Sequence, residues 1–272
     1  MTSRVGTPAH FLGLVRVEIQ AIFGRASGRA ALALAAVVGV GACLALQQAQ
    51  DLAQNMTTGG VPAGQLLTAD LPSALGWALN GRNLFVLPLM LVLSAAATLA
   101  GELSDFTLRE ALVRPVSRAQ VILAKLLALT ALSTSSLLIT LVAALGVGAA
   151  LFGASGELGP VLLGFALSLP SDIGLLCMTL LAASLVRSVG GVVVMLALYL
   201  LADKAVGAGL GLLANFGVAW AGQVRPYLPG TSLGLWADYA EELDPHKALG
   251  LLLLTGLTLG GTLLRLKRMD VP

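Results

Sequence analysis

Charged side chains are scarce in this sequence, and their scarcity decides the class of protein. Only 11% of the 272 residues are Asp, Glu, Lys or Arg, whereas 57% are hydrophobic. An ordinary soluble domain has about 25% charged and about 45–50% apolar residues. The composition excludes such a domain and predicts a polytopic membrane protein, whose spans leave no room here for a large soluble domain.

Motifs of covalent chemistry are also missing. The sequence contains no G-x-x-x-x-G-K-[ST] loop for phosphate, no H-E-x-x-H zinc motif and no G-x-S-x-G nucleophile motif. Its two histidines, His10 and His246, lie near opposite ends of the chain, which argues against a histidine-based active site. We therefore predict that the chain is not an enzyme on its own and binds no cofactor itself.

Cysteine is limited to Cys43 and Cys177, and both lie inside apolar stretches. This placement predicts two free buried thiols, with neither a disulfide nor a metal site. The sequence also lacks a basic cluster with interleaved aromatic residues. Nucleic acid is therefore not an expected partner.

Long apolar stretches are what the sequence has instead. A membrane-spanning helix needs about 17–25 predominantly apolar residues. Six stretches reach that length, which predicts an all-α integral membrane protein with six transmembrane helices. The stretches are Ala30–Leu46, Leu84–Ala100, Ala119–Phe152, Pro160–Val186, Gly190–Leu213 and Ala248–Leu264.

The positions of Lys and Arg predict the orientation. Four basic residues precede the first span, four follow the second, one follows the fourth and three follow the sixth. Cytoplasmic loops carry an excess of Lys and Arg, so both termini are expected inside (N-in/C-in). The opposite side carries a few basic residues, among them Arg82, and an acidic run formed by Asp238, Glu241, Glu242 and Asp244.

Residues 1–28 are predicted to form an amphipathic helix before the first span. Apolar residues recur there at helical spacing on one face: Leu12, Val15, Ile19, Ile22 and Phe23. Such a segment is typical of an interfacial helix that lies along the inner leaflet. A solvated leader is the alternative.

Two segments on the extracytoplasmic side are longer than simple turns. They are residues 51–81, rich in glycine and proline, and residues 214–246, which hold Trp220, Tyr227, Trp236 and Tyr239. Tyr and Trp favour the membrane–water interface. We expect both segments to form short interfacial helices or re-entrant caps.

The segment Gly101–Lys125 is a charged interruption between the second and third spans. Its sequence predicts a short amphipathic helix and then a break at Pro115, which cannot continue a helix. Ser117 and Gln120 have the spacing of a capping box at the start of the third span. The segment is either a docking element for a soluble partner or a basic loop that anchors the membrane face.

Three charged residues fall within the apolar stretches. Charges at bilayer depth are costly and usually face protein or water. Asp172 lies midway along the fourth stretch, after Pro170, and either lines a substrate path or serves the structure, by capping a broken helix or by bonding between helices. Asp203 and Lys204 lie either at the solvated outer end of a shorter fifth span or deep in a longer one.

The run GELSDFTLREALVRPVSRAQVILAKLLAL resembles the span–coupling helix–span signature of ABC type-2 transporter permeases. The matching features are an acidic residue (Glu102), a short helix (Thr107–Leu112), an Arg-Pro-Val-Ser-Arg step (114–118) and a basic residue (Lys125). The resemblance implies that residues 102–118 form a cytoplasmic coupling segment on an ATPase. The coupling residues it implies are Glu102, Thr107, Leu108, Arg109, Glu110, Leu112, Arg114 and Arg118.

The same resemblance implies an organisation and a set of partners. Residues 29–266 would form the permease domain of an ATP-driven exporter in the cell (inner) membrane, and residues 267–272 a cytoplasmic tail. Two separate ABC ATPase subunits would hold ATP and Mg, and a second permease copy or homologue would complete the complex. Membrane lipids are further expected partners. An accessory extracytoplasmic protein is a further partner that the sequence leaves open.

An ion-coupled secondary transporter or channel-like protein is the alternative function, with Asp172, Asp203 and Lys204 as the coupling residues. A membrane-embedded lipid enzyme is a third class, which the missing catalytic cluster disfavours. The transported substrate cannot be predicted from the sequence.

Overall fold

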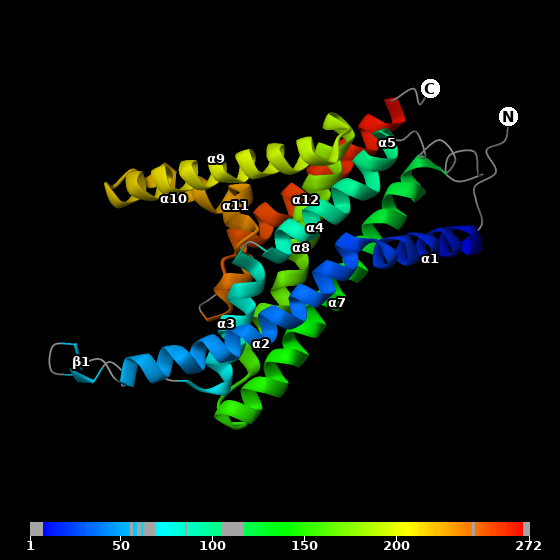
Figure 1. Cartoon of the computed structure of the whole chain (residues 1–272). Helices are drawn as coiled ribbons and strands as arrows, with labels where there is room; N and C mark the ends of the chain where they lie inside the picture. Colours follow the sequence, from blue (N-terminus) through cyan, green and yellow to red (C-terminus); the bar gives the residue numbers. More distant parts are fainter. Residues whose placement is uncertain are drawn as a thin grey trace.

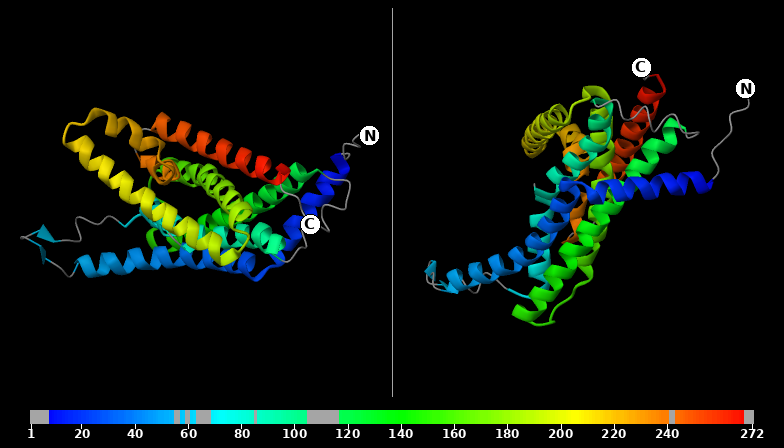
Figure 2. Two further views of the ribbon diagram at one scale, coloured as in Figure 1. Left: turned by 90° about the horizontal axis from the view of Figure 1, so that it is seen from above. Right: turned by 45° about the vertical axis from the view of Figure 1, so that its right-hand side comes forward.

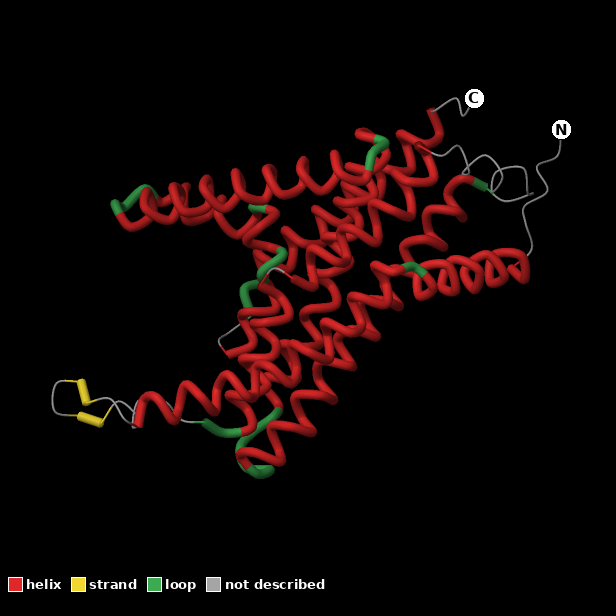
Figure 3. The backbone as a smooth tube through the Cα atoms, in the orientation of Figure 1, coloured by secondary structure: helices red, strands yellow, loops and turns green. Residues whose placement is uncertain are grey.

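The fold is almost entirely helical (Figure 3). The structure, a computed structural model, describes residues 8–54, 57–58, 61–62, 69–84, 86–104, 117–240 and 243–268. In these ranges the only strands are a short antiparallel pair, β1 (Thr57–Thr58) and β2 (Val61–Pro62). The all-α prediction is confirmed.

Eight long helices and six short ones make up the described chain. The long helices are α1 (Pro8–Gly24), α2 (Ala26–Gln54), α3 (Leu71–Leu84), α4 (Val86–Ala96), α7 (Arg118–Phe152), α8 (Gly159–Val186), α9 (Val189–Asn215) and α12 (Pro245–Arg268). The short ones are the π-helix η2 (Ala97–Gly101), α5 (Glu102–Ser104), α10 (Ala219–Val224), η3 (Arg225–Tyr227), α11 (Pro229–Ser232) and η4 (Leu235–Ala240).

Among the described residues, six helical stretches are long and apolar enough to cross a membrane, as predicted. Their boundaries extend beyond the expected ones. The second stretch begins at Leu71 and not at Leu84, because α3 packs into the bundle with side chains such as Leu75 and Leu79 fully buried. The glycine, asparagine and proline in this part of the sequence had suggested an external segment.

The long helices form a bundle around α8 (Figures 1 and 2). Helix α8 packs against α7, α4 and α12, while α2 runs beside α7. The start of α1, the end of α5, the start of α7 and the end of α12 lie toward one end of the molecule in Figure 1. The strand pair and the end of α7 lie toward the other.

Helix α1 lies across the bundle at a sharp turn from α2 (Figure 1). Gly28 permits this turn, the elbow of residues 24–28, since a Cβ atom at that position would collide with the carbonyl oxygen of Ile22. Ile22 is buried against the core, with Ile19 and Phe23 beside it, and α1 packs on α7. A helix is thus present within the predicted residues 1–28 and is anchored to the bundle, whereas its place along the inner leaflet stays a prediction.

The carboxylate of Asp70 caps α3. It accepts a hydrogen bond from the backbone N–H of Ser73 at 2.8 Å, and hydrogen bonds from Ser73 lower the pKa of Asp70. A lowered pKa stabilises the folded state above the ordinary pKa, and this stability is lost as the pH falls through the lowered value. We expect Asp70→Ala to cost about 0.5–2 kcal/mol at neutral pH. The cost should vanish in acid, as measured by unfolding of the purified protein; a pH-independent cost would contradict this role.

Short helices fill the segment between α9 and α12, as predicted for residues 214–246. They are α10, η3, α11 and η4. Trp236 and Tyr239 of η4 pack against the core formed by α2, α3, α7 and α8. These two aromatic residues therefore join the segment between α9 and α12 to the bundle.

Candidate functional site

Four charged side chains meet where α1, α2, α5 and α7 come together. We call them the Lys125 cluster, and they are Glu18, Arg25, Glu102 and Lys125. The Nζ of Lys125 lies 2.9 Å from Oε1 of Glu18 and 2.7 Å from Oε2 of Glu102. Arg25 donates to the other oxygen of Glu102 at 3.3 Å. The cluster has two carboxylates and two cations, so its formal charge is balanced.

Lys125 is the centre of this cluster and is completely buried. A buried ammonium group is stable only when it is paired, and removing one partner of a buried pair typically costs about 3–5 kcal/mol. Glu18 reaches Lys125 because it lies on the face of α1 that carries Ile22, four residues later. The cluster therefore joins α1 and the elbow to the spans.

Glu102 was predicted from the sequence as a coupling residue, whereas Glu18 and Arg25 were missed. One signal could have shown Glu18: it is an acid within the apolar periodicity of residues 15–22. No comparable signal indicates Arg25, because its position depends on the elbow.

The predicted capping box at the start of α7 is confirmed. The side chain of Ser117 accepts from the backbone N–H of Gln120, and the side chain of Gln120 accepts from the backbone N–H of Ser117. Next to it, Arg118 donates from Nη1 to the carbonyl oxygen of Leu266 at 2.6 Å. That carbonyl belongs to the last turn of α12, where cations are favourable.

The predicted coupling segment is therefore described only at its two ends. Glu102 lies in the Lys125 cluster, and Arg118 lies on the last turn of α12. The remaining predicted coupling residues lie outside the described residues. They are Thr107, Leu108, Arg109, Glu110, Leu112 and Arg114.

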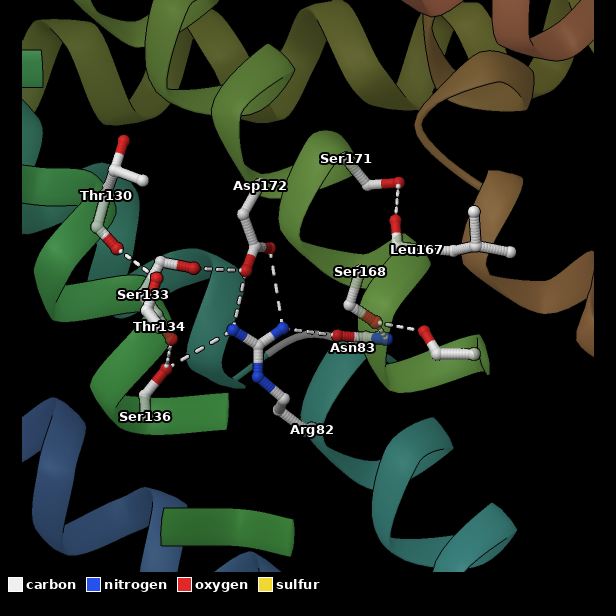
Figure 4. A network of polar contacts seen from close by, with 11 residues as sticks. Arg82, Asn83, Thr130, Ser133, Thr134, Ser136, Leu167, Ser168, Ser171 and Asp172 are labelled. Carbon is white, nitrogen blue, oxygen red and sulfur yellow. Dashed lines mark hydrogen bonds and ion pairs between the residues drawn. The ribbon is translucent and has the colours of Figure 1, made fainter. Parts of the chain in front are cut away.

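A second buried network surrounds Asp172 in the middle of the bundle (Figure 4). Nη2 of Arg82 lies 2.6 Å from Oδ2 of Asp172, and Nη1 lies 3.4 Å from Oδ1. The hydroxyls of Ser133 and Ser136 on α7 bond to Asp172 and Arg82, respectively. Asn83 accepts from Nη1 of Arg82 at 2.6 Å. Three helices, α3, α7 and α8, thus share one neutral polar network.

The structure corrects two expectations about this region. Arg82 was placed among the extracytoplasmic charges, but it is fully buried and forms an ion pair with Asp172. A helix broken at Pro170 and capped by Asp172 was one of the alternatives left open, but α8 continues through Pro170 from Gly159 to Val186. Neighbouring helices tolerate a proline inside a membrane bundle by satisfying the groups that it frees. Asp172 therefore bonds between helices and caps no helix end.

Asp203 and Lys204 differ in environment although they are adjacent. Helix α9 continues past both to Asn215, as in the longer of the two predicted alternatives. Asp203 is buried and accepts from the backbone N–H of Gly230 at 2.7 Å, whereas Lys204 is exposed. A Cβ atom at position 230 would collide with this carboxylate, so any larger residue there would displace the side chain of Asp203. Asp203 thus attaches α11 to α9.

Possible metal ligands do not gather into a cluster within the described ranges. No group of three or more His, Cys, Asp or Glu side chains could hold a metal ion there. Cys43 and Cys177 are both free and buried, which confirms the prediction of two buried thiols.

Comparison with known proteins identifies the family. No curated protein matches the chain. Residues 30–206, more than half of the chain, match the family model described as ABC-2 family transporter protein. The matched range covers three of the six membrane-length stretches in full and most of the first and fifth, and it includes the Asp172 network, Glu102 and Lys125. This multi-pass membrane protein therefore belongs to the ABC-2 transporter family and is a permease component of an ABC transporter.

Proposed function

We propose that this chain is the permease subunit of an ATP-driven exporter and that residues 102–118 couple it to a separate ATPase. The family match supports the permease role. The anchoring of both ends of the segment supports the coupling role. Glu102 is held by Lys125, and Arg118 is held by the last turn of α12.

A force on residues 102–118 would reach several helices at once. At its start the force passes from Glu102 to α1, the elbow and α7 through the Lys125 cluster. At its end the force acts directly on α7 and, through Arg118, on α12. Closure of an ATPase beneath the segment would therefore move the first, third and sixth spans together.

The partners follow from this role. Two ABC ATPase subunits would hold ATP and Mg, because this sequence has no phosphate-binding loop. A second permease copy or homologue would complete the complex, with lipids around it. The distribution of Lys and Arg supports an N-in/C-in orientation in the inner membrane, with residues 102–118 on the ATPase side.

The proposal predicts a specific complex. The tagged full chain, purified in detergent from its native membranes, should carry an ABC ATPase subunit identified by mass spectrometry. The complex should hydrolyse ATP, whereas the permease alone should not. Transport driven by an imposed ion gradient, in liposomes that contain no ATPase, would instead support the ion-coupled alternative.

Charge reversal within the coupling segment tests the mechanism. We expect Glu110→Lys or Arg114→Glu to reduce ATPase binding about tenfold or more, because each replaces attraction by repulsion at the contact. The unfolding temperature should not change. Lys267→Glu, at an exposed position in the last turn of α12, is the control and should bind normally. Wild-type binding by both reversal variants would contradict the docking role.

A further inference from the structure

The helix that leads to Glu102 contains an unusual turn. Residues Ala97–Gly101 form the π-helix η2, between α4 and α5. A π-helix bonds residue i to i+5, so each π turn holds one residue more than an α turn. Such turns are rare and occur frequently at functional sites. Glu102, the next residue, is the first of the proposed coupling segment.

This turn decides where Glu102 points. One residue occupies about 100° of an α-helix. If residues 86–102 formed a regular α-helix, Glu102 would be rotated by about that angle and would leave the Lys125 cluster. With the π turn in place, its carboxylate lies 2.7 Å from Lys125 and 3.3 Å from Arg25.

Local side chains both support the turn and show its cost. The buried hydroxyl of Thr98 lies 2.8 Å from the carbonyl oxygens of both Ser94 and Ala95, at the point where the α-helical bonding pattern changes. The buried hydroxyl of Ser94 has no hydrogen-bond partner among the described residues. A buried hydroxyl without a partner is unfavourable. The ion pairs of Glu102 offset that cost.

We propose that η2 is a two-position element that engages and releases Glu102. In the π form, seen here, Glu102 is bound to Lys125. In the α form the extra residue is absorbed into a regular helix, and Glu102 rotates away from the cluster. The inference rests on the proposed function, because the load on residues 102–118 is what would shift the balance between the two forms.

Glu18, Arg25 and Lys125 are then positioning residues for the coupling segment. They stabilise the π form only while Glu102 faces them, and they hold α1 and the elbow in the same cluster. ATPase movement that turns Glu102 away would break its ion pairs with Arg25 and Lys125, while Glu18 keeps α1 paired to α7. The switch thus couples rotation at the start of the segment to the attachment of the second span to α7 and the elbow.

Cysteine labelling can follow the switch. Leu103 packs against the core in the π form, so in the α form its side chain would rotate away from that contact. A Leu103→Cys variant, made with Cys43→Ala and Cys177→Ala, would carry one reactive thiol. In the complex with the ATPase, a membrane-impermeant maleimide labels this thiol at a measurable rate. That rate should change about fivefold or more on addition of a non-hydrolysable ATP analogue.

Two changes to η2 should alter this response. Deleting one of the three alanines at 95–97 removes the extra residue and leaves Glu102 facing Lys125, so the labelling rate should no longer respond to nucleotide.

Thr98→Ala removes the supporting hydroxyl and should shift the nucleotide-free labelling rate toward the ATP-bound rate. Thr98→Ser keeps the hydroxyl and should behave as the parent. Thr134→Ala is the matched control, because that hydroxyl bonds to the carbonyl of Thr130 within a regular α-helix.

The outcomes separate this inference from the proposed function. A parent chain that binds no ATPase would overturn the proposed function. A parent chain that binds ATPase but shows no nucleotide response in labelling would overturn the switch alone. A nucleotide response that persists after the alanine deletion, or a Thr98→Ala variant that labels like Thr134→Ala, would also overturn it.

Discussion

Replacing Asp172 by alanine is expected to destabilise the protein by about 3–5 kcal/mol. The variant would leave the guanidinium of Arg82 fully buried without its carboxylate. The hydroxyls of Ser133 and Ser136 can compensate for hydrogen bonds but not for charge. Chemical unfolding of the purified protein in detergent would measure the loss.

Two further variants make this expectation specific to charge. The double variant Arg82→Met with Asp172→Leu removes both charges and should recover most of the loss, because a well-packed apolar pair can replace a buried ion pair. Ser171→Ala is the neighbouring control, since that hydroxyl bonds only within its own helix, to the carbonyl of Leu167. A stable Asp172→Ala variant would show that the pair does not hold α3 to α8.

Lys125→Met is the second change with a large expected effect. It would leave the carboxylates of Glu18 and Glu102 close together without the buried cation between them, at a cost of about 3–5 kcal/mol. Since Glu18 holds α1 to α7, hydrogen exchange should increase throughout α1 as well as at the start of α7.

Matched replacements distinguish charge from packing here. Lys125→Arg keeps the cation and should retain most of the stability. Arg16→Met removes an exposed cation from α1 and should change stability by less than about 0.5 kcal/mol. Equal protection of α1 in the Lys125→Met variant and the parent chain would contradict the role of the cluster.

Local features of the fold could be predicted from the sequence. The six apolar stretches follow from composition and length, and the capping box of Ser117 and Gln120 follows from spacing within four residues. Both features depend only on residues that are close together in the sequence. The proposed coupling segment was also predicted from a continuous run of residues, through its resemblance to the family, and it stays a prediction.

The partners of the buried charges could not be predicted. Glu18 and Lys125 are 107 residues apart, and Arg82 and Asp172 are 90 residues apart. Helical periodicity shows which face of a helix is buried, but it does not show which helix covers that face. Arg82 was therefore assigned to the outside, because its partner was not known.

The π-helix η2 and the continuity of α8 through Pro170 could not be predicted from the sequence either. The alternative helical forms differ by one hydrogen-bond register, so neighbouring side chains such as Thr98 decide between them. Proline lowers helix propensity locally, but α8 stays continuous through Pro170, and membrane bundles tolerate such a residue.

Helix α7 runs without interruption from Arg118 to Phe152 and carries both buried charge networks. Lys125 and Ser133 are eight residues apart, which is about 12 Å along the axis. Over so short a length an α-helix behaves as a stiff rod, so the two networks cannot shift independently. A tilt of this rod at the Lys125 cluster must therefore appear at the Asp172 network, so α7 acts as a lever between the coupling segment and the middle of the bundle.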